Sequence, residues 1–465
     1  MNGNLYARLA AQFPAERNKA FARMPDGREV SYGALEAGAG RLATLLQAKG
    51  VAPGDRVAVQ TAKSLEAVML YLAALKLGAV LLPLNTAYTA AEVDYFVTDA
   101  EPSLFVTDAV ALAAEAANLA PLETVHEAAP DDLAAILYTS GTTGRSKGAL
   151  LTHGALAANG QALTDAWGFT AGDVLLHALP IYHVHGLFIA LHCVFLSGST
   201  VLWLPKFDEA EVLAALRQST VMMGVPTFYT RLLADPNFTR EATETIRLFV
   251  CGSAPLLPST FADFEQRIGQ PILERYGMSE AAIITTNPLV GERIAGSVGY
   301  PLPGVDLRVA DDGLVQIKGP SVTRGYWRKP EKTAEAFTAD GYFITGDIGR
   351  QDDDGRLWLS GRSSDLIISG GLNVYPKEIE LVLDEMAGVV ESAVIGCPHP
   401  DFGEAVVAVV AGAGDEAAMI AEMRTQLAVF KCPKRVFFVA DLPRNTMGKV
   451  LKADLRRTYA DVFKV

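Results

Sequence analysis

The chain has 465 residues, half of them hydrophobic and 20% charged, which predicts a globular protein with several structural units rather than a disordered one. Its formal net charge of −13 argues against wholesale binding to nucleic acid or to an anionic membrane, because both need a basic surface. The four cysteines lie far apart without a CxxC pair, which indicates neither a disulfide framework nor a zinc site and favours a reducing compartment.

Neither the start of the chain nor its apolar stretches predict a targeting or membrane segment. Residues 1–13 lack the basic start and apolar core of a signal peptide. The stretches 67–84 and 187–205 are interrupted by residues such as Lys76 and His192, so each predicts a buried helix followed by a buried strand. We therefore expect a soluble, cytoplasmic protein without a membrane or nucleic-acid partner.

Short β-rich runs alternate with helix-length amphipathic segments in the first part of the chain. This alternation is typical of an α/β fold, in which helices flank parallel sheets and ligands bind at the carboxyl ends of the strands. The predicted strands are residues 56–60, 79–84, 103–108, 133–138, 173–179, 199–204, 220–225, 246–252 and 271–277.

The pattern of predicted secondary structure changes twice after these strands. From about 296 to 361, short runs separated by Gly- and Asp-rich turns predict a β-rich subdomain. From 366 to 465, a mixture of helix and strand patterns predicts a small α+β domain. The expected organisation is an N-terminal domain of residues 1–361, a connection at 362–365 and a C-terminal domain.

A loop rich in glycine and hydroxyl groups, "YTSGTTGRSKG", follows the predicted strand 133–138. Backbone N–H groups in such a turn bind anions, and Lys147 adds a positive charge. The glycine spacing does not match the Walker A pattern, which weakens the case for a P-loop NTPase. Taken alone, a loop of this composition is equally compatible with a flexible surface turn.

Further motifs follow in order: "CGSAPL" at 251, "RYGMSE" at 275, "FITGDIG" at 343, "GRSSDLIISGGLNVYPKEIE" at 361 and "PRNTMGK" at 443. Together with the glycine-rich loop, they closely resemble the signatures of the acyl-adenylate-forming superfamily, which includes acyl-CoA synthetases and luciferases. The resemblance spans nearly the whole chain. It implies that a carboxylate attacks the α-phosphorus of ATP and expels pyrophosphate, after which a thiol displaces AMP. ATP and CoA are then co-substrates, with Mg²⁺ as the cofactor.

The resemblance also implies a role for individual residues. Glu280 matches the Mg²⁺ ligand, and Lys147 and Lys449 match cations that assist the reaction, Lys449 by bridging carboxylate and phosphate. Asp347 and Arg362 match the residues that hold the ribose. On its own, each has another reading, since a Gly-flanked Asp is often a turn residue and a near-terminal Lys is usually solvated. The implied ATP-binding residues are Thr139, Ser140, Gly141, Thr142, Thr143, Gly144, Lys147, Ala254, Pro255, Tyr276, Gly277, Ser279, Asp347, Arg362 and Lys449.

In this family the C-terminal domain rotates about a hinge between the two half-reactions, so we expect a mobile domain here. Ser364 matches the hinge position, where the family usually has Asp or Lys. Gly370 and Gly371 match a loop that borders the CoA tunnel, where close backbone approach leaves no room for a Cβ atom.

The segments "LPIYHVHGLF", "VPTFYTRLL" and "CGSAPLL" resemble the malonyl-CoA synthetase branch of the superfamily. In that branch, the residues that match Arg231 and Ser253 bind the distal carboxylate of a dicarboxylic acid. Phe228, Arg231 and Leu232 are expected on one helix face, with Arg231 either reaching the rim or buried with an anion. His183, His185 and Met278 are expected to line the same pocket.

A buried Arg231 would reject monocarboxylates, because it would be left unpaired. We therefore predict malonate, with methylmalonate as a second candidate, as the acid. The alternatives are an acyl-CoA synthetase for another short-chain or aromatic acid, and a non-catalytic nucleotide-binding protein with the same fold. The oligomeric state does not follow from the sequence.

Overall fold

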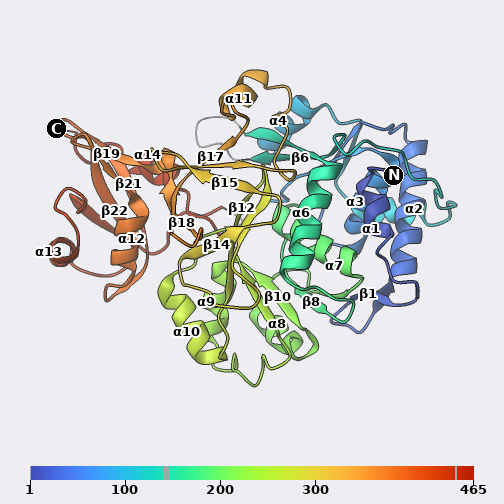
Figure 1. Ribbon diagram of the computed structural model, residues 1–465, viewed down its shortest axis with the longest axis horizontal. Coiled ribbons are helices and arrows are strands. Elements are labelled where there is room, and N and C mark those ends of the chain that lie inside the picture. The colour runs from blue at the N-terminus through green and yellow to red at the C-terminus, as the bar shows by residue number, and fades with distance from the viewer. Residues whose placement is uncertain (1, 140–145, 446–447, 465) are drawn as a thin grey trace.

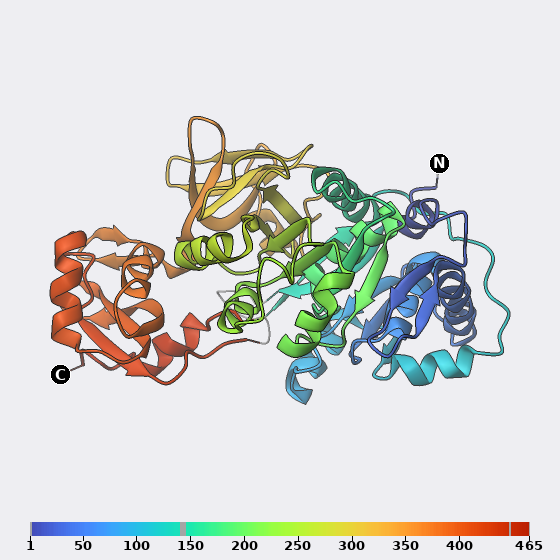
Figure 2. The ribbon, with the colours of Figure 1, turned by 90° about the horizontal axis from the view of Figure 1, so that it is seen from below.

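The computed structural model describes residues 2–139, 146–445 and 448–464. The molecule is elongated, with a large N-terminal part that contains two sheets and a separate C-terminal lobe at one end (Figures 1 and 2). This arrangement confirms the predicted fold class, a large α/β part followed by a smaller C-terminal unit.

The first sheet has five strands in the order β5-β3-β4-β6-β7. Four of them run parallel as predicted, whereas β7 (Lys147–Thr152) runs antiparallel to β6 (Leu133–Thr139). The glycine-rich loop thus joins the two arms of a β-hairpin at the carboxyl end of β6. The other strands are β3 (Arg56–Val59), β4 (Val80–Pro83) and β5 (Leu104–Val106).

The second sheet has 13 strands in the order β15-β16-β17-β18-β14-β13-β12-β11-β10-β8-β9-β1-β2. Its central strands run parallel, and the pairing becomes antiparallel from β12 onward. The strands of the β-rich segment therefore continue this sheet. The parallel strands are β8 (Val174–His177), β9 (Thr200–Trp203), β10 (Val221–Gly224), β11 (Leu248–Cys251) and β12 (Leu273–Met278). The others are β1 (Ala20–Arg23), β2 (Glu29–Ser31), β13 (Ala282–Thr286), β14 (Ser297–Pro301), β15 (Asp306–Val309), β16 (Leu314–Lys318), β17 (Phe343–Gln351) and β18 (Leu357–Arg362).

The helices begin at caps that the sequence supplies. The Ser64 side chain accepts a hydrogen bond from the backbone of Ala67 at the start of α3 (Leu65–Leu77), and Gly78, with φ 78°, ends that helix. Helix α3 belongs to a core cluster that takes apolar side chains from both sheets. The other helices of this part are α1 (Leu5–Ala10), α2 (Tyr32–Ala48), α4 (Ala90–Ala100), α5 (Ala109–Ala116), α6 (His153–Ala166), the π-helix η1 (His185–Ala190), α7 (Leu191–Ser197), α8 (Glu209–Ala215), η2 (Leu216–Gln218), α9 (Pro226–Ala234), α10 (Pro258–Ile268) and α11 (Pro330–Glu335).

The C-terminal lobe contains a five-stranded sheet with its own apolar cores. Strands β21 (Val389–His399) and β22 (Gly403–Gly412) form its central antiparallel pair, and β23 (Arg435–Val439) lies parallel to β22. The remaining elements are η3 (Ser363–Asp365), β19 (Ile367–Ser369), β20 (Leu372–Val374), α12 (Pro376–Asp384), α13 (Glu416–Gln426) and α14 (Lys452–Thr458).

The two apolar stretches singled out in the sequence form helix-then-strand pairs, as expected. Residues 67–84 contain most of α3 and all of β4, and residues 187–205 contain α7 and β9. Within the described ranges, no helix combines the length and the apolar character needed to cross a bilayer.

Candidate active site

The end of the β6–β7 hairpin brings a cation, a phenol and a carboxylate together. Thr139 and Lys147 pair across the hairpin, and Lys147 Nζ lies 4.6 Å from the centre of the Tyr326 ring. Tyr326 in turn donates a hydrogen bond of 3.2 Å to Glu280 Oε1. Burial raises the pKa of Glu280, whose side chain is enclosed at this point. The predicted loop residues Ser140, Gly141, Thr142, Thr143 and Gly144 lie outside the described residues.

Tyr326 was missed by the sequence analysis, although it contacts both Lys147 and Glu280. It belongs to "RGYW" at 324–327, a segment in which Gly325 has a φ of 123°. A Gly-flanked aromatic pair beyond a sheet is a signal for a shaped loop, but the sequence does not say what the loop contacts.

The predicted ribose-binding residues Asp347 and Arg362 form a second cluster with Tyr276, on strands β17, β18 and β12 of the 13-stranded sheet. Asp347 on β17 pairs in register with Arg362 at the end of β18, and Arg362 Nε lies 2.7 Å from Asp347 Oδ1. Tyr276, at the end of β12, donates its hydroxyl to Asp347 Oδ2. Burial raises the pKa of Asp347. A carboxylate held between a cation and a phenol has a fixed direction, which suits it to accept hydrogen bonds from a sugar.

Lys449 lies close enough to this cluster to interact with its charges. The residue keeps contact with solvent, yet loss of hydration in the cleft, together with the nearby Arg362 guanidinium, lowers its pKa. Its backbone N–H donates 3.0 Å to Asn445 Oδ1, and Gly448 before it has a φ of 76°. Asp347 acts on the pKa of Lys449 in the opposite direction to Arg362, which places the lysine within electrostatic range of both.

The remaining predicted ATP-binding residues lie on the two turns that follow β11 and β12. Ala254 is half-buried and Pro255 is exposed in the first turn, and Ser279 is half-buried in the second. Gly277 has no room for a side chain, because a Cβ atom there would lie 1.9 Å from the carbonyl oxygen of Ala282.

The predicted acid pocket contains histidines and a serine in close contact. Ser253, with the unusual φ of 71°, places its Oγ 3.3 Å from Nδ1 of His185. His185 is fully buried, and its Nε2 has no hydrogen-bond partner. Burial lowers the pKa of His183 to about 4 and that of His185 well below its ordinary value, with a further contribution from Arg275. Both rings are therefore neutral at pH 7.

Arg275, which the sequence analysis did not single out, is the buried cation of this region. It is 5% exposed, and neither Nε nor Nη2 has a hydrogen-bond partner. Burial lowers its pKa to about 10, so it remains charged at neutral pH. The guanidinium lies under Gly252, where a Cβ atom would be 2.5 Å from Arg275 Cζ. A charged residue within an otherwise buried parallel strand was the available signal.

The expectation that Arg231 is buried is wrong. Its side chain is 63% exposed and lies 3.6 Å from Glu209. Leu232 is buried, whereas Phe228 stacks on Phe207 with ring centres 4.0 Å apart. Residues one apart on a helix point about 100° apart, so Arg231 falls at the edge of the face that Leu232 buries. Met278, at the end of β12, is half-buried.

The predicted hinge and tunnel residues lie in and beside the C-terminal lobe. Ser364 is in the short helix η3, next to Asp365, which forms an ion pair of 2.6 Å with Arg456. Gly370 and Gly371 form the turn between β19 and β20 with φ values of 59° and 79°. A side chain at either position would be strained in this conformation.

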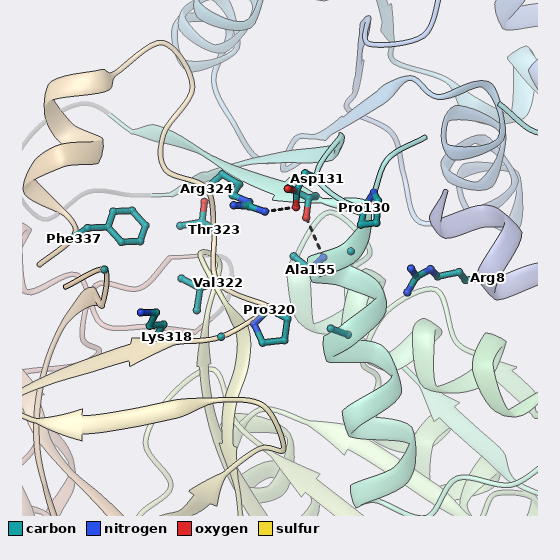
Figure 3. Close-up of a pocket in the computed structure, with 15 residues that line it drawn as sticks. Arg8, Pro130, Asp131, Ala155, Lys318, Pro320, Val322, Thr323, Arg324 and Phe337 are labelled. Atoms are coloured by element: carbon teal, nitrogen blue, oxygen red, sulfur yellow. Dashed lines mark hydrogen bonds and ion pairs between the residues drawn. The ribbon is translucent and has the colours of Figure 1, made fainter. Parts of the chain in front are cut away.

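A cavity of about 610 Å³ lies elsewhere in the N-terminal part (Figure 3). It is bordered by the start of α6 and the segment 318–324, and an ion pair between Arg324 and Asp131 crosses it. Thr323, which borders the cavity, donates its backbone N–H to the Glu280 carbonyl at 2.6 Å, but Glu280 itself does not line the cavity. The motifs of the resemblance do not line it. Among the residues that the structure describes, no group of three or more His, Cys, Asp or Glu side chains has the arrangement of a metal site.

Comparison with known proteins agrees with this geometry. A family model described as AMP-binding enzyme matches residues 7–327, and one described as AMP-binding enzyme C-terminal domain matches residues 378–449. The chain is 34% identical to a malonate–CoA ligase from Arabidopsis thaliana over 98% of this chain and 89% of that protein. It is 36% identical to a feruloyl-CoA synthase from an Amycolatopsis species over 93% of this chain and 94% of that protein.

Solved structures give the same result. The ATP-bound MatB from Rhodopseudomonas palustris aligns over 100% of both chains with a TM-score of 0.97 and 49% identity. The apo structure of MatB also aligns over 100% of both chains, with a TM-score of 0.83 and 50% identity. The chain therefore belongs to the AMP-binding enzyme family, as an adenylate-forming acid–thiol ligase.

Proposed function

We propose that this protein is an ATP-dependent malonyl-CoA synthetase. In the proposed reaction, malonate and ATP form malonyl-AMP and pyrophosphate, and CoA then displaces AMP to give malonyl-CoA. The observation that carries the choice of acid is Arg275, a buried cation with two unpartnered nitrogen atoms beside the contact between Ser253 and His185. Methylmalonate is a second substrate if the pocket accepts one more methyl group.

The adenylation step follows from the charges around the nucleotide. Asp347 and Arg362 hold the ribose, while Lys147 and Lys449 reduce the repulsion between the malonate carboxylate and the triphosphate. Glu280 is a buried carboxylate on the phosphate side, and a hard cation such as Mg²⁺ prefers oxygen ligands. Bound Mg²⁺ would supply further neutralisation of the phosphates. The better agreement with ATP-bound MatB than with apo MatB supports assigning this arrangement of the lobes to adenylation.

The thioester step requires the C-terminal lobe to change position. We place the hinge at 362–365, between an N-terminal domain of 1–361 and a C-terminal domain of 366–465. Rotation about Ser364 would remove Lys449 from the nucleotide and bring Gly370 and Gly371 toward the entry path of CoA. Ser364 carries no charge, and the hinge residues on either side of it, Arg362 and Asp365, form ion pairs with Asp347 and Arg456.

Selectivity for a dicarboxylate follows from the cost of leaving Arg275 unpaired. A guanidinium binds a carboxylate through two parallel hydrogen bonds, and Nε and Nη2 are a pair of nitrogens that can do so. Ser253 is placed to donate to the same carboxylate, and Arg231 lies at the rim. A monocarboxylic acid would leave the buried charge without a partner, so it should be rejected.

The test is pyrophosphate release and thioester formation with ATP, Mg²⁺ and CoA across malonate, methylmalonate, succinate, acetate, octanoate and benzoate. Turnover confined to malonate-like diacids supports the proposal. Preference for a monocarboxylate contradicts the choice of acid but leaves adenylation in place, and release of pyrophosphate with none of the acids contradicts both.

The second candidate is a ligase for an aromatic acid, which the similarity to the feruloyl-CoA synthase favours. Ferulate added to the same panel separates the two functions. The Arg231→Ala variant gives an independent comparison, because removing a rim cation should weaken turnover of a diacid and leave turnover of an aromatic monocarboxylate unchanged.

A further inference from the structure

A half-buried lysine, Lys63, lies where the two sheets of the N-terminal part meet. It follows β3 of the five-stranded sheet, yet its ammonium group contacts the ends of β8 and β9 in the other sheet. Lys63 Nζ lies 2.9 Å from His177 Nδ1, 2.8 Å from the His177 carbonyl oxygen and 2.6 Å from that of Leu204. It also lies 4.4 Å from the centre of the Trp203 ring. The three N–H donors of the ammonium group therefore each have an acceptor.

The contacts of His177 determine its tautomer. Its Nε2 lies 3.0 Å from the carbonyl oxygen of Gly186, which can only accept a hydrogen bond. The proton of the neutral ring is therefore on Nε2, and Nδ1 accepts from Lys63. The ring also stacks on Trp203 with centres 5.4 Å apart and an angle of 11° between the planes. One directed chain of hydrogen bonds thus runs from Lys63 through His177 to the backbone of Gly186.

Gly186 is the second residue of η1 and follows His183 and His185 in the segment 183–186. A side chain at this position is impossible, because a Cβ atom would lie 2.1 Å from the Pro180 carbonyl oxygen. The preceding residue, His185, contacts Ser253 and is the first residue of the π-helix η1. Single turns of π-helix are frequent at functional sites. The position of the Gly186 carbonyl therefore limits where His185 can lie.

We propose that Lys63 and His177 are positioning residues for the acid-binding segment 183–186. In this proposal they set the affinity for the acid and not the affinity for ATP. Neither residue contacts the nucleotide cluster of Tyr276, Asp347 and Arg362 through a hydrogen bond. The identity of the acid rests on the proposed function, but the role of the two residues holds for whichever acid occupies this pocket.

The test compares full-length variants by steady-state kinetics, varying the acid and ATP separately. Lys63→Met keeps the side-chain stem and removes the ammonium group, and should raise KM for the acid by about tenfold while KM for ATP changes by less than about twofold. His177→Ala should have the same effect. His177→Gln should raise the acid KM by only about threefold, because its amide can still donate to the Gly186 carbonyl.

Lys19→Met is the matched control. Lys19 Nζ also binds two backbone carbonyls, those of Ala171 and Gly198, at 2.6 Å each, but neither carbonyl belongs to the acid-binding segment 183–186. This variant should lose thermal stability without a change in the acid KM.

An acid KM that stays at the wild-type value in Lys63→Met and His177→Gln would overturn the inference, as would equal increases in the KM values for acid and ATP. If Lys63→Met fails to fold, His177→Gln decides by the same criterion.

The wild-type acid panel keeps this result separate from the choice of substrate. The variants are assayed with the acid that the wild-type enzyme uses best. If that acid is not malonate, the proposed function fails while the positioning role is still measured. If malonate is used but the variants keep its KM, the positioning role fails alone.

Discussion

The nucleotide side and the acid side of the candidate site differ in how their charges are compensated. On the nucleotide side, Asp347 is paired with Arg362 and Glu280 accepts a hydrogen bond from Tyr326. On the acid side, Arg275 has two unpartnered nitrogens, and the adjacent His183 and His185 are held neutral by burial.

This difference indicates what each side needs from its ligand. The paired charges on the nucleotide side are complete before ATP arrives, so they orient a ligand at little cost of reorganisation. The acid side keeps an unpaired positive charge in a buried place, which is unfavourable until an anion enters. Under the proposed function, binding of the second carboxylate of the acid would neutralise this charge and so favour a dicarboxylate.

The largest expected effect is that of Arg275→Met. This variant should lower kcat/KM for malonate by about a hundredfold, because a buried charge-assisted contact is removed. Its thermal stability should not fall, since the replacement removes an uncompensated buried charge. Kinetics with malonate and acetate and a thermal melt measure both. Arg217→Met, at an exposed pair with Glu241, is the control and should leave kcat/KM unchanged. A large loss of stability with unchanged malonate kinetics would contradict the comparison.

Asp347→Asn should lower thermal stability and leave the kinetics with the acid almost unchanged, which is the opposite of the effect expected for Arg275→Met. Removing one member of a largely buried ion pair leaves Arg362 without its counter-charge, so the melting temperature should fall and KM for ATP should rise by about tenfold. KM for the acid should stay within about twofold. Asp340→Asn is the matched control, because it breaks a pair with Arg308 of the same 2.7 Å length whose side chains are 41% and 57% exposed. If the two variants lower the melting temperature equally, the Asp347–Arg362 pair stabilises the folded protein no more than the exposed Arg308–Asp340 pair does, which would contradict the comparison.

The smallest expected effect concerns Glu274, the neighbour of Arg275 on β12. Burial raises the pKa of Glu274 from 4.5 to about 8, so the folded protein binds this proton more tightly than the unfolded chain. The stabilisation is complete below the unfolded pKa of 4.5 and is lost as the pH rises through about 8.

Glu274→Gln should therefore show a flatter dependence of melting temperature on pH over this window, with malonate kinetics unchanged. Thermal melts on both sides of about pH 8 measure the slope. Glu265→Gln, an exposed residue of α10, should keep the wild-type slope. An unchanged slope in Glu274→Gln would show that Glu274 does not hold its proton in the folded protein.

The residues proposed for the nucleotide site could be named from the sequence because they lie on short motifs that resemble those of a known family, although each residue alone has another reading. Asp347 and Arg362 were predicted from "TGD" and "GRSSD", and β17 and β18 place them opposite each other. The sequence also indicated the positions of the strands of the α/β part along the chain and their parallel direction. It did not predict that β7 returns beside β6 or that the β-rich strands continue the large sheet. Hydrogen bonding between distant strands decides both.

What the sequence by itself determined is the family, the fold class and the places where strands end in polar or glycine-rich turns, because these depend on residue type and spacing over a few positions. Only the tertiary structure decided which charges are buried. Helical spacing left Arg231 either at the rim of the acid pocket or buried with an anion, and packing leaves its side chain 63% exposed. Arg275 and Lys63 come from different sheets, and no local pattern relates them. The burial of Arg275 and the contacts of Lys63 with His177 and Leu204 depend on segments that are distant in the sequence, so only the folded chain determines them.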